Sequence, residues 1–206
     1  MSNLYPEANF HKFSISAMFL LTRPNAAQID AFLQERESDS FSYREVGGTR
    51  ESPPSGYNID HNRMMIGNGE KDFEAAKVAI REWKMFDVPG LELFYSDTPI
   101  EAGRNVAPLA RHLGFYSLNS CRIVYVIDEA ERFGFAYGTL TEHAEIGEER
   151  FTVEFHRDTG EVWYDILAFS RPGNFLVKLG YPYGRYKQKQ FSTRSMAAMS
   201  RAVSGQ

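Results

Sequence analysis

The sequence predicts an α+β fold in which a curved antiparallel sheet wraps round a long C-terminal helix. Two observations carry this prediction: four runs that alternate apolar and polar residues follow one another closely between 118 and 171, and a helical pattern occupies 182–203. Runs joined by short turns pair as antiparallel strands. A third observation, an amphipathic helix that starts after residue 69, supplies a second element to cover the sheet.

We expect residues 1–56 to form an N-terminal extension that packs on a core formed by residues 57–206. Residues 1–206 are therefore predicted to form a single domain. Residues 14–21 read as a strand, and Pro24-Asn25 opens a short helix. The apolar side of that helix is formed by Ile29, Phe32 and Leu33. The chain from 35 to 57 is polar and rich in Gly, Pro and Ser, which is typical of a loop.

The next part of the chain predicts a strand, a helix and two short strands. The strand spans 57–66, and a turn at 67–69 leads into the helix, which we expect to end at Pro89-Gly90. The apolar side of the helix is Phe73, Ala76, Ile80 and Trp83. The short strands are expected at 91–95 and 105–112.

Residues 121–171 predict an antiparallel meander. The first hairpin, closed across a four-residue loop, places Gly138 opposite Cys121, so that a small residue leaves space for the sulfur. We therefore expect Cys121 to be a buried, unreactive thiol. The second hairpin turns at 157–160 between strands at 149–156 and 161–171.

Asp165 is the acidic residue of the meander that most needs a partner. The second hairpin pairs it with Thr152 on a mixed face of the sheet, which we expect the N-terminal part to cover. A covered carboxylate is stabilised by a cation such as Arg150 or Arg171. A structural ion pair and a carboxylate that orients a ligand or takes part in catalysis both remain open for Asp165.

Charge is distributed unevenly along the chain. The last 36 residues carry seven Lys or Arg and no acid, whereas the first 170 residues have a net charge of -11. One interpretation is a basic helix docked on an acidic body, and the other is a basic face for an anionic membrane or nucleic acid. The acidic body would repel an extended polyanion, so we expect no nucleic-acid partner.

A single cysteine allows no disulfide within the chain and is typical of the reducing cytosol. No basic n-region precedes an apolar run near the start, and no run is long enough to cross a bilayer. We therefore expect a cytoplasmic protein without a membrane span. Its oligomeric state is not indicated by the sequence.

Several motifs resemble those of a known family. They are Ser42-Tyr43-Arg44-Glu45-Val46-Gly47-Gly48-Thr49-Arg50, Arg132-Phe133-Gly134-Phe135-Ala136-Tyr137-Gly138-Thr139-Leu140, Gly147-Glu148-Glu149-Arg150-Phe151, Trp163-Tyr164-Asp165-Ile166 and Phe169-Ser170-Arg171-Pro172. Together they resemble the family called domain of unknown function 1990, over about residues 19–199. The resemblance implies no catalytic residue. The order of elements also resembles, more loosely, the helix-grip superfamily of lipid-transfer, pollen-allergen and polyketide-cyclase-like proteins, which is a likeness of fold.

Residue types that carry chemistry are sparse. The five histidines are scattered, so we expect no metal site and no cofactor. His143, in the loop 141–147, is expected to be solvated unless it lies at the mouth of a cavity. Asp165, His143 and Tyr137 are the candidates for general acid or base work if the protein is an enzyme.

The sequence favours a protein that binds a hydrophobic or aromatic small molecule, without covalent chemistry, between the sheet and the C-terminal helix. Strand alternation and helical spacing select the expected ligand-binding residues, which are Phe151, Val153, Tyr164, Ile166, Gln188, Phe191, Met199, Tyr137 and Asp165. We expect Gln188 to bond Tyr164 or the ligand. An enzyme that acts on such a ligand and an interaction module without a ligand are the alternatives; overpacking by Ala198→Leu is expected only if the core is filled.

Overall fold

The computed structural model describes residues 19–94, 98–141, 143–173, 178 and 180–205. The strands are β1 Phe19–Leu20, β2 Asn58–Asn68, β3 Leu91–Phe94, β4 Asn105–Arg111, β5 Tyr116–Leu118, β6 Cys121–Asp128, β7 Arg132–Thr139, β8 Glu145–Phe155 and β9 Glu161–Pro172. The helices are α1 Ala26–Glu35, α2 Glu70–Arg81, the 3-10 turn η1 Lys84–Phe86 and α4 Tyr181–Ser204.

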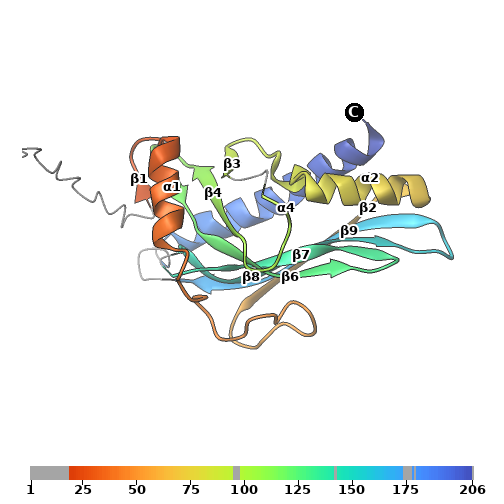
Figure 1. Ribbon diagram of the computed structural model, residues 1–206, viewed down its shortest axis with the longest axis horizontal. Helices are drawn as coiled ribbons and strands as arrows, with labels where there is room; N and C mark the ends of the chain where they lie inside the picture. The colour runs from red at the N-terminus through yellow and green to blue at the C-terminus, as the bar shows by residue number, and fades with distance from the viewer. Residues whose placement is uncertain (1–18, 95–97, 142, 174–177, 179, 206) are drawn as a thin grey trace, which may run out of the picture.

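The strands form one curled antiparallel sheet in the order β1-β5-β4-β6-β7-β8-β9-β2, with β3 paired to β4. The helices α2 and α4 contact each other and cover one face of it, and α4 runs along that face against β2 and β9 (Figure 1). This arrangement confirms the predicted sheet wrapped round the C-terminal helix. It is a helix-grip fold.

The meander has the predicted pairing in its second hairpin and a different one in its first. Thr152 lies opposite Asp165, as expected. In the first hairpin, a β-bulge between Ile123 and Tyr125 shifts the register, so that Thr139 lies opposite Cys121 and Gly138 lies opposite Arg122. The prediction of Gly138 opposite Cys121 is therefore wrong. The turn lies one residue later than predicted, since Asp128 pairs with Phe133, and the bulge then moves the register back by a single residue.

The bulge also changes which residues of β6 point to the core. Before it, Cys121 and Ile123 belong to the large apolar cluster beneath the helices. After it, Tyr125 and Ile127 belong to a separate cluster on the other face, with Ala136. Cys121 is fully buried, as predicted, and this burial raises the pKa of its thiol. Its low reactivity stays a prediction.

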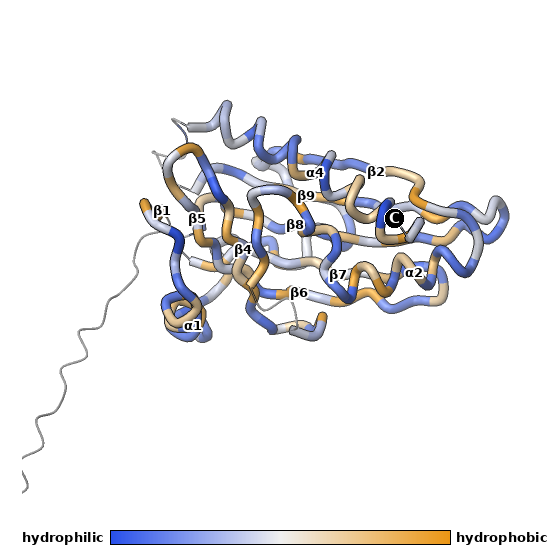
Figure 2. Tube along the Cα trace, turned by 90° about the horizontal axis from the view of Figure 1, so that it is seen from above, coloured by the Kyte–Doolittle hydropathy of each residue, from blue (hydrophilic) through white to orange (hydrophobic). Residues whose placement is uncertain are grey.

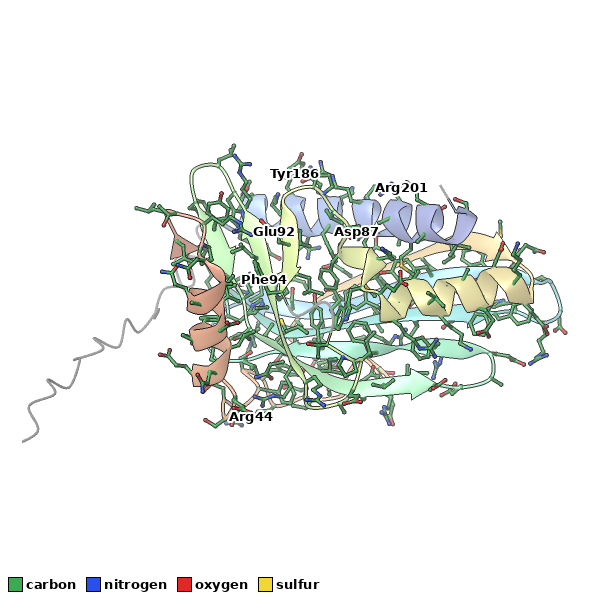
Figure 3. The ribbon with its side chains drawn as sticks, turned by 45° about the horizontal axis from the view of Figure 1, so that its top comes forward. Arg44, Asp87, Glu92, Phe94, Tyr186 and Arg201 are labelled. Atoms are coloured by element: carbon green, nitrogen blue, oxygen red, sulfur yellow. The ribbon has the colours of Figure 1, made fainter. Side chains whose placement is uncertain are left out.

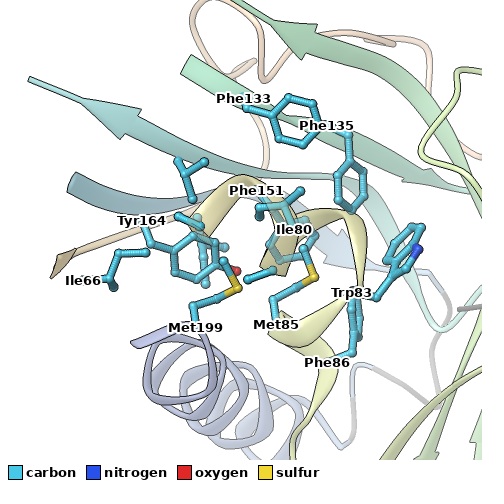
Figure 4. Close-up of a cluster of buried hydrophobic side chains, with 14 of the residues drawn as sticks. Ile66, Ile80, Trp83, Met85, Phe86, Phe133, Phe135, Phe151, Tyr164 and Met199 are labelled. Atoms are coloured by element: carbon cyan, nitrogen blue, oxygen red, sulfur yellow. The ribbon is translucent and has the colours of Figure 1, made fainter. Parts of the chain in front are cut away.

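The large cluster fills the space between the sheet and the helices α2 and α4 (Figure 4). Aromatic rings dominate it: the ring centroids of Trp83 and Phe135 lie 4.8 Å apart, nearly edge to face, and those of Phe135 and Phe151 lie 5.5 Å apart. Such pairs contribute about 0.5–1.5 kcal/mol each beyond the burial of their area. Phe151, Tyr164 and Met199 are fully buried here.

The helix α2 is shorter than predicted. It ends at Arg81 rather than at Pro89-Gly90, and Trp83 takes a left-handed conformation with φ 57° that starts the turn η1. This change of direction buries Trp83, Met85 and Phe86 together. A continued helix would turn some of these side chains toward solvent, so tertiary packing decides where the helix ends.

The N-terminal part contacts the sheet at two places. Asn25 caps α1 with a capping box, and Ile29, Phe32 and Leu33 pack on β4 and β5, as the predicted apolar side of α1 requires. The short strand β1 pairs with β5. Residues 14–18 of the predicted first strand lie outside the described residues, and the single domain over 1–206 stays a prediction.

Candidate functional site

A cavity of about 860 Å³ lies between the sheet and α4, beside the aromatic cluster. It exists because the inward-facing rows of three adjacent strands change from large apolar residues to small or polar ones at the same end of the sheet. The inner row of β8 runs Phe155, Val153, Phe151, Glu149, Gly147, Glu145; that of β9 runs Tyr164, Ile166, Ala168, Ser170; and that of β2 runs Ile66, Met64, Asn62, Asp60. The register places Glu149, Ala168 and Asp60 side by side, so the space left by small side chains is continuous.

Tyr137 and Glu149 form the central polar pair of the cavity wall. They lie opposite each other on β7 and β8, and the Tyr137 hydroxyl donates to Glu149 Oε2 over 2.8 Å. Burial raises the pKa of Glu149 to about 7, an effect that the Tyr137 hydrogen bond opposes and that Asp60 and Glu145 reinforce. Protein surrounds the carboxyl group, yet it keeps an accessible surface because it faces the cavity.

A network of polar side chains joins α4 to the sheet. Arg185 forms a two-pronged ion pair with Asp60 and donates to Gln188 Oε1 over 2.7 Å. Gln188 in turn donates to Glu145 Oε2 over 2.6 Å and to Ser170 Oγ over 3.2 Å. Burial raises the pKa of Glu145, although its hydrogen bonds with Ser170 and Gln188 lower it. Arg185 is thus the point at which the basic helix docks on the acidic body.

His143 lines the cavity and is not the solvated loop residue that the sequence predicted. Its Nδ1 accepts the backbone N–H of Glu145 over 3.0 Å, which leaves the proton on Nε2. Burial lowers its pKa to about 4, so the ring is neutral at pH 7. His143 is therefore a neutral donor at the cavity wall.

The structure divides the predicted ligand-binding residues into two groups on the inner side of the sheet and a single residue, Asp165, on the other side. Tyr137, Ile166, Gln188 and Phe191 line the cavity. Phe151, Val153, Tyr164 and Met199 are buried in the neighbouring cluster. Gln188 does not bond Tyr164, whose hydroxyl instead pairs with Ser195 Oγ at 3.0 Å, because Tyr164 lies within the filled part of the core.

Asp165 lies on the opposite face of the sheet, as its strand position predicted. Arg150 Nη2 donates to its Oδ1 over 2.9 Å, and His61 Nε2 lies 2.5 Å from its Oδ2. The expected partner Arg150 is confirmed. Because the sheet separates Asp165 from the cavity, its place favours the structural ion pair.

A buried network on that outer face explains the motif at 42–50. Glu148, only 3% exposed, accepts four hydrogen bonds from this loop: from the hydroxyl of Tyr43, the backbone N–H of Gly47, and the N–H and hydroxyl of Thr49. A Cβ atom on Gly138 would lie 2.0 Å from the Tyr43 hydroxyl, so glycine is required there. The network holds the loop against the outer face.

Sequence reasoning missed Glu149 and Glu145 as cavity residues. The signal was present for Glu149, because it stands two residues before Phe151 and therefore shares its inward face. Within the described part of the chain, no group of three or more His, Cys, Asp or Glu residues is arranged to hold a metal ion. No helix among the described residues is long and apolar enough to cross a bilayer.

Comparison with known proteins identifies the family. The family model described as domain of unknown function DUF1990 matches residues 42–198, which include the outer-face loop, the cavity strands and most of α4. The chain belongs to this family. The DUF1990 chain is also similar to three UPF0548 proteins, from Dictyostelium discoideum (34% identical, covering 90% of this chain and 96% of the relative), Arabidopsis thaliana (35%, 82% and 84%) and Deinococcus radiodurans (37%, 83% and 88%).

Solved structures resemble this DUF1990 chain more distantly. A hypothetical protein of Helicobacter pylori aligns with a TM-score of 0.49 at 13% identity, covering 79% of this chain and 97% of that one. Human STARD10 aligns with a TM-score of 0.45 at 12% identity, covering 92% and 83%. Likenesses at this level carry no information about activity.

Proposed function

We propose that the protein binds a hydrophobic or aromatic small molecule in the cavity between the sheet and α4. The observation that carries this proposal is the cavity itself. Its volume of about 860 Å³ falls within the range of about 300–1,000 Å³ that is usual for ligand sites, and apolar side chains such as Phe86, Ile166 and Phe191 line it. An interaction module with a filled core, the alternative without a ligand, would not contain such a space.

The polar residues of the cavity indicate where a ligand's polar group lies. Glu149 presents its second oxygen, Oε1, to the cavity, since Tyr137 occupies only Oε2 and no other described residue bonds the carboxyl. A mainly apolar ligand with one hydrogen-bond donor fits this arrangement, because the donor satisfies Oε1 while the apolar body contacts Phe86 and Phe191.

The first experiment is native mass spectrometry of protein taken gently from its own cells, which is expected to reveal a carried small molecule. The second is a titration with N-phenyl-1-naphthylamine, an apolar fluorophore with one N–H donor. We expect saturable binding that Ala168→Leu weakens, since Ala168 lines the cavity. The matched control is Ala198→Leu, on the buried side of α4 outside the cavity lining. Absence of both a carried molecule and saturable dye binding would refute the proposal.

An enzyme that uses the same cavity is the second candidate. It is favoured by the Tyr137 and Glu149 pair, because a carboxyl group with a pKa of about 7 is present in both protonation states near neutral pH. A screen for turnover of aromatic esters and ring ketones separates the two functions. In an enzyme, Glu149→Gln abolishes turnover and leaves dye binding within a few-fold of the wild type; in a binder, no turnover is found.

A further inference from the structure

The most exposed apolar side chains of the described chain gather at one end of the molecule. Leu113 is 90% exposed and Leu21 is 87% exposed. Leu113 stands in the tight turn between β4 and β5, which the His112 N–H closes by donating to the Phe115 carbonyl. Leu21 follows β1, the strand paired with β5, so both leucines lie at the same edge of the sheet. Isolated exposed apolar residues are normal, but a group of them marks a contact surface.

The start of α4 continues this surface. His112 links the two parts, since its Nδ1 lies 3.2 Å from the Tyr183 hydroxyl and its ring stacks on Phe115. Tyr183 and Tyr186 are both exposed, and Tyr186 lies on the side of α4 turned away from the sheet (Figure 3). The strands β1 and β5 and the start of α4 lie at the same end of the molecule in the view from above (Figure 2).

Positive charge surrounds these side chains. The segments 19–23, 111–115 and 180–194 contain six Lys or Arg residues and no acid. Arg23 pairs with Glu92 and Arg185 pairs with Asp60. The remaining four, which have no carboxylate partner among the described residues, are Arg111, Lys187, Lys189 and Arg194. We call the set Leu21, Leu113, Tyr183, Tyr186, Arg111, Lys187 and Lys189 the mouth surface, because Tyr183, Tyr186, Lys187 and Lys189 also line the outer part of the cavity.

We infer that the mouth surface docks on an anionic phospholipid bilayer, with the cavity opening toward the lipid. Lysine and arginine are attracted to the anionic headgroups, and tyrosine suits the interface because its ring is apolar and its hydroxyl is polar. Leucine side chains at a turn reach the acyl boundary without burying backbone polar groups. A purely acidic protein partner would satisfy the cations but would not account for two leucines held almost entirely in water.

The first test is co-sedimentation with vesicles. Wild-type protein is expected to pellet with vesicles of phosphatidylcholine and phosphatidylserine at low salt, to be released as salt is raised, and to stay in solution with pure phosphatidylcholine. Failure to pellet with the anionic vesicles at low salt would overturn the inference and would favour an acidic protein as the occupant. Equal binding to both vesicle types would also overturn the inference, because it would show no preference for anionic lipid.

Variants locate the contact. Lys189→Ala is expected to weaken vesicle binding about 5-fold, and Leu113→Ser about 10-fold. The matched controls are Lys71→Ala and Val78→Ser, exposed residues of α2 away from the mouth surface, which are expected to bind as the wild type does. Equal losses in variants and controls would overturn the assignment of this surface.

Separate measurements test the membrane docking and the proposed ligand site, so one proposal can be refuted while the other stands. Titration with N-phenyl-1-naphthylamine without vesicles reports on the cavity alone, and Leu113→Ser, which lies outside the cavity lining, is expected to leave dye binding unchanged. Loss of vesicle binding by Leu113→Ser with normal dye binding is the expected result and supports docking through the mouth surface, whereas normal vesicle binding by this variant speaks against it. A wild type that binds the dye but no vesicle overturns the docking and leaves the cavity function in place.

Discussion

The ionisation of Glu149 makes the sharpest prediction about stability. A carboxyl group whose pKa is raised by folding favours the protonated form in the folded state, so the folded protein holds a proton that the unfolded chain has already lost between pH 4.5 and about 7. Stability therefore falls as pH rises through this range and levels off above pH 7. Glu149→Gln removes this effect and keeps an oxygen that accepts the Tyr137 hydrogen bond.

The size of the effect follows from the shift. A pKa moved from 4.5 to about 7 corresponds to about 3 kcal/mol, and water in the cavity makes this an upper value. The gain from Glu149→Gln is thus close to zero at pH 4.5 and rises to at most about 3 kcal/mol at pH 8. His143, whose lowered pKa removes stability as pH falls from 6.5 toward 4, affects wild type and variant alike and cancels in the difference.

The assay is urea denaturation of both proteins at half-unit steps between pH 4.5 and 8. Glu148→Gln is the matched control, since Glu148 is the preceding residue and faces the outer side of the sheet, where four hydrogen bonds reach its carboxylate. It is expected to lose about 2–4 kcal/mol, because an amide nitrogen would meet N–H donors. A stability difference for Glu149→Gln that does not change with pH would show that the carboxyl group is not buried as described.

Three further predictions concern packing. Ala168→Leu is expected to change stability by less than about 1 kcal/mol, because the cavity accepts the larger side chain. Ala198→Leu overpacks the buried side of α4 and is expected to cost about 1–3 kcal/mol. Thermal unfolding measures both variants, and equal costs would contradict an open cavity. Gly138→Ala displaces the Tyr43 hydroxyl from Glu148 and is expected to lower stability by about 2–4 kcal/mol. The loop 42–50 should then be cleaved faster by protease, and an unchanged rate of cleavage would argue against the network. Cys121 is expected to react with a thiol reagent far more slowly in native than in denatured protein, and similar rates would disprove its burial.

Much of the fold follows from local patterns. The alternation in 149–156 and 161–171 predicted which residues face the helices, and the turn between them predicted the pairing of Thr152 with Asp165. The start of α1 at Asn25 was also predicted. These features are predictable because strand alternation and helix capping depend on residues only a few positions apart.

The cavity depended on contacts that local patterns do not contain. Alternation alone places Glu149 and Phe151 on the same face, but only the register with β9 and β2 decides that Glu149 stands beside Ala168 and Asp60, where the space is unfilled. The bulge after Ile123 likewise depends on how β6 fits β7. The outer loop reaches Glu148 across about a hundred residues of chain.

The sequence by itself determined the class of the fold, the inner and outer rows of the second hairpin of the meander and the concentration of positive charge near the C-terminus. Tertiary structure decided where α2 ends, which way Tyr125 points, and that Tyr137 and Glu149 meet in a cavity while Phe151 and Tyr164 fill the core beside it. The physical reason is that periodicity depends on neighbouring residues. Register, bulges and unfilled space instead depend on the packing of side chains from distant parts of the chain, which becomes defined only when all of them are in place.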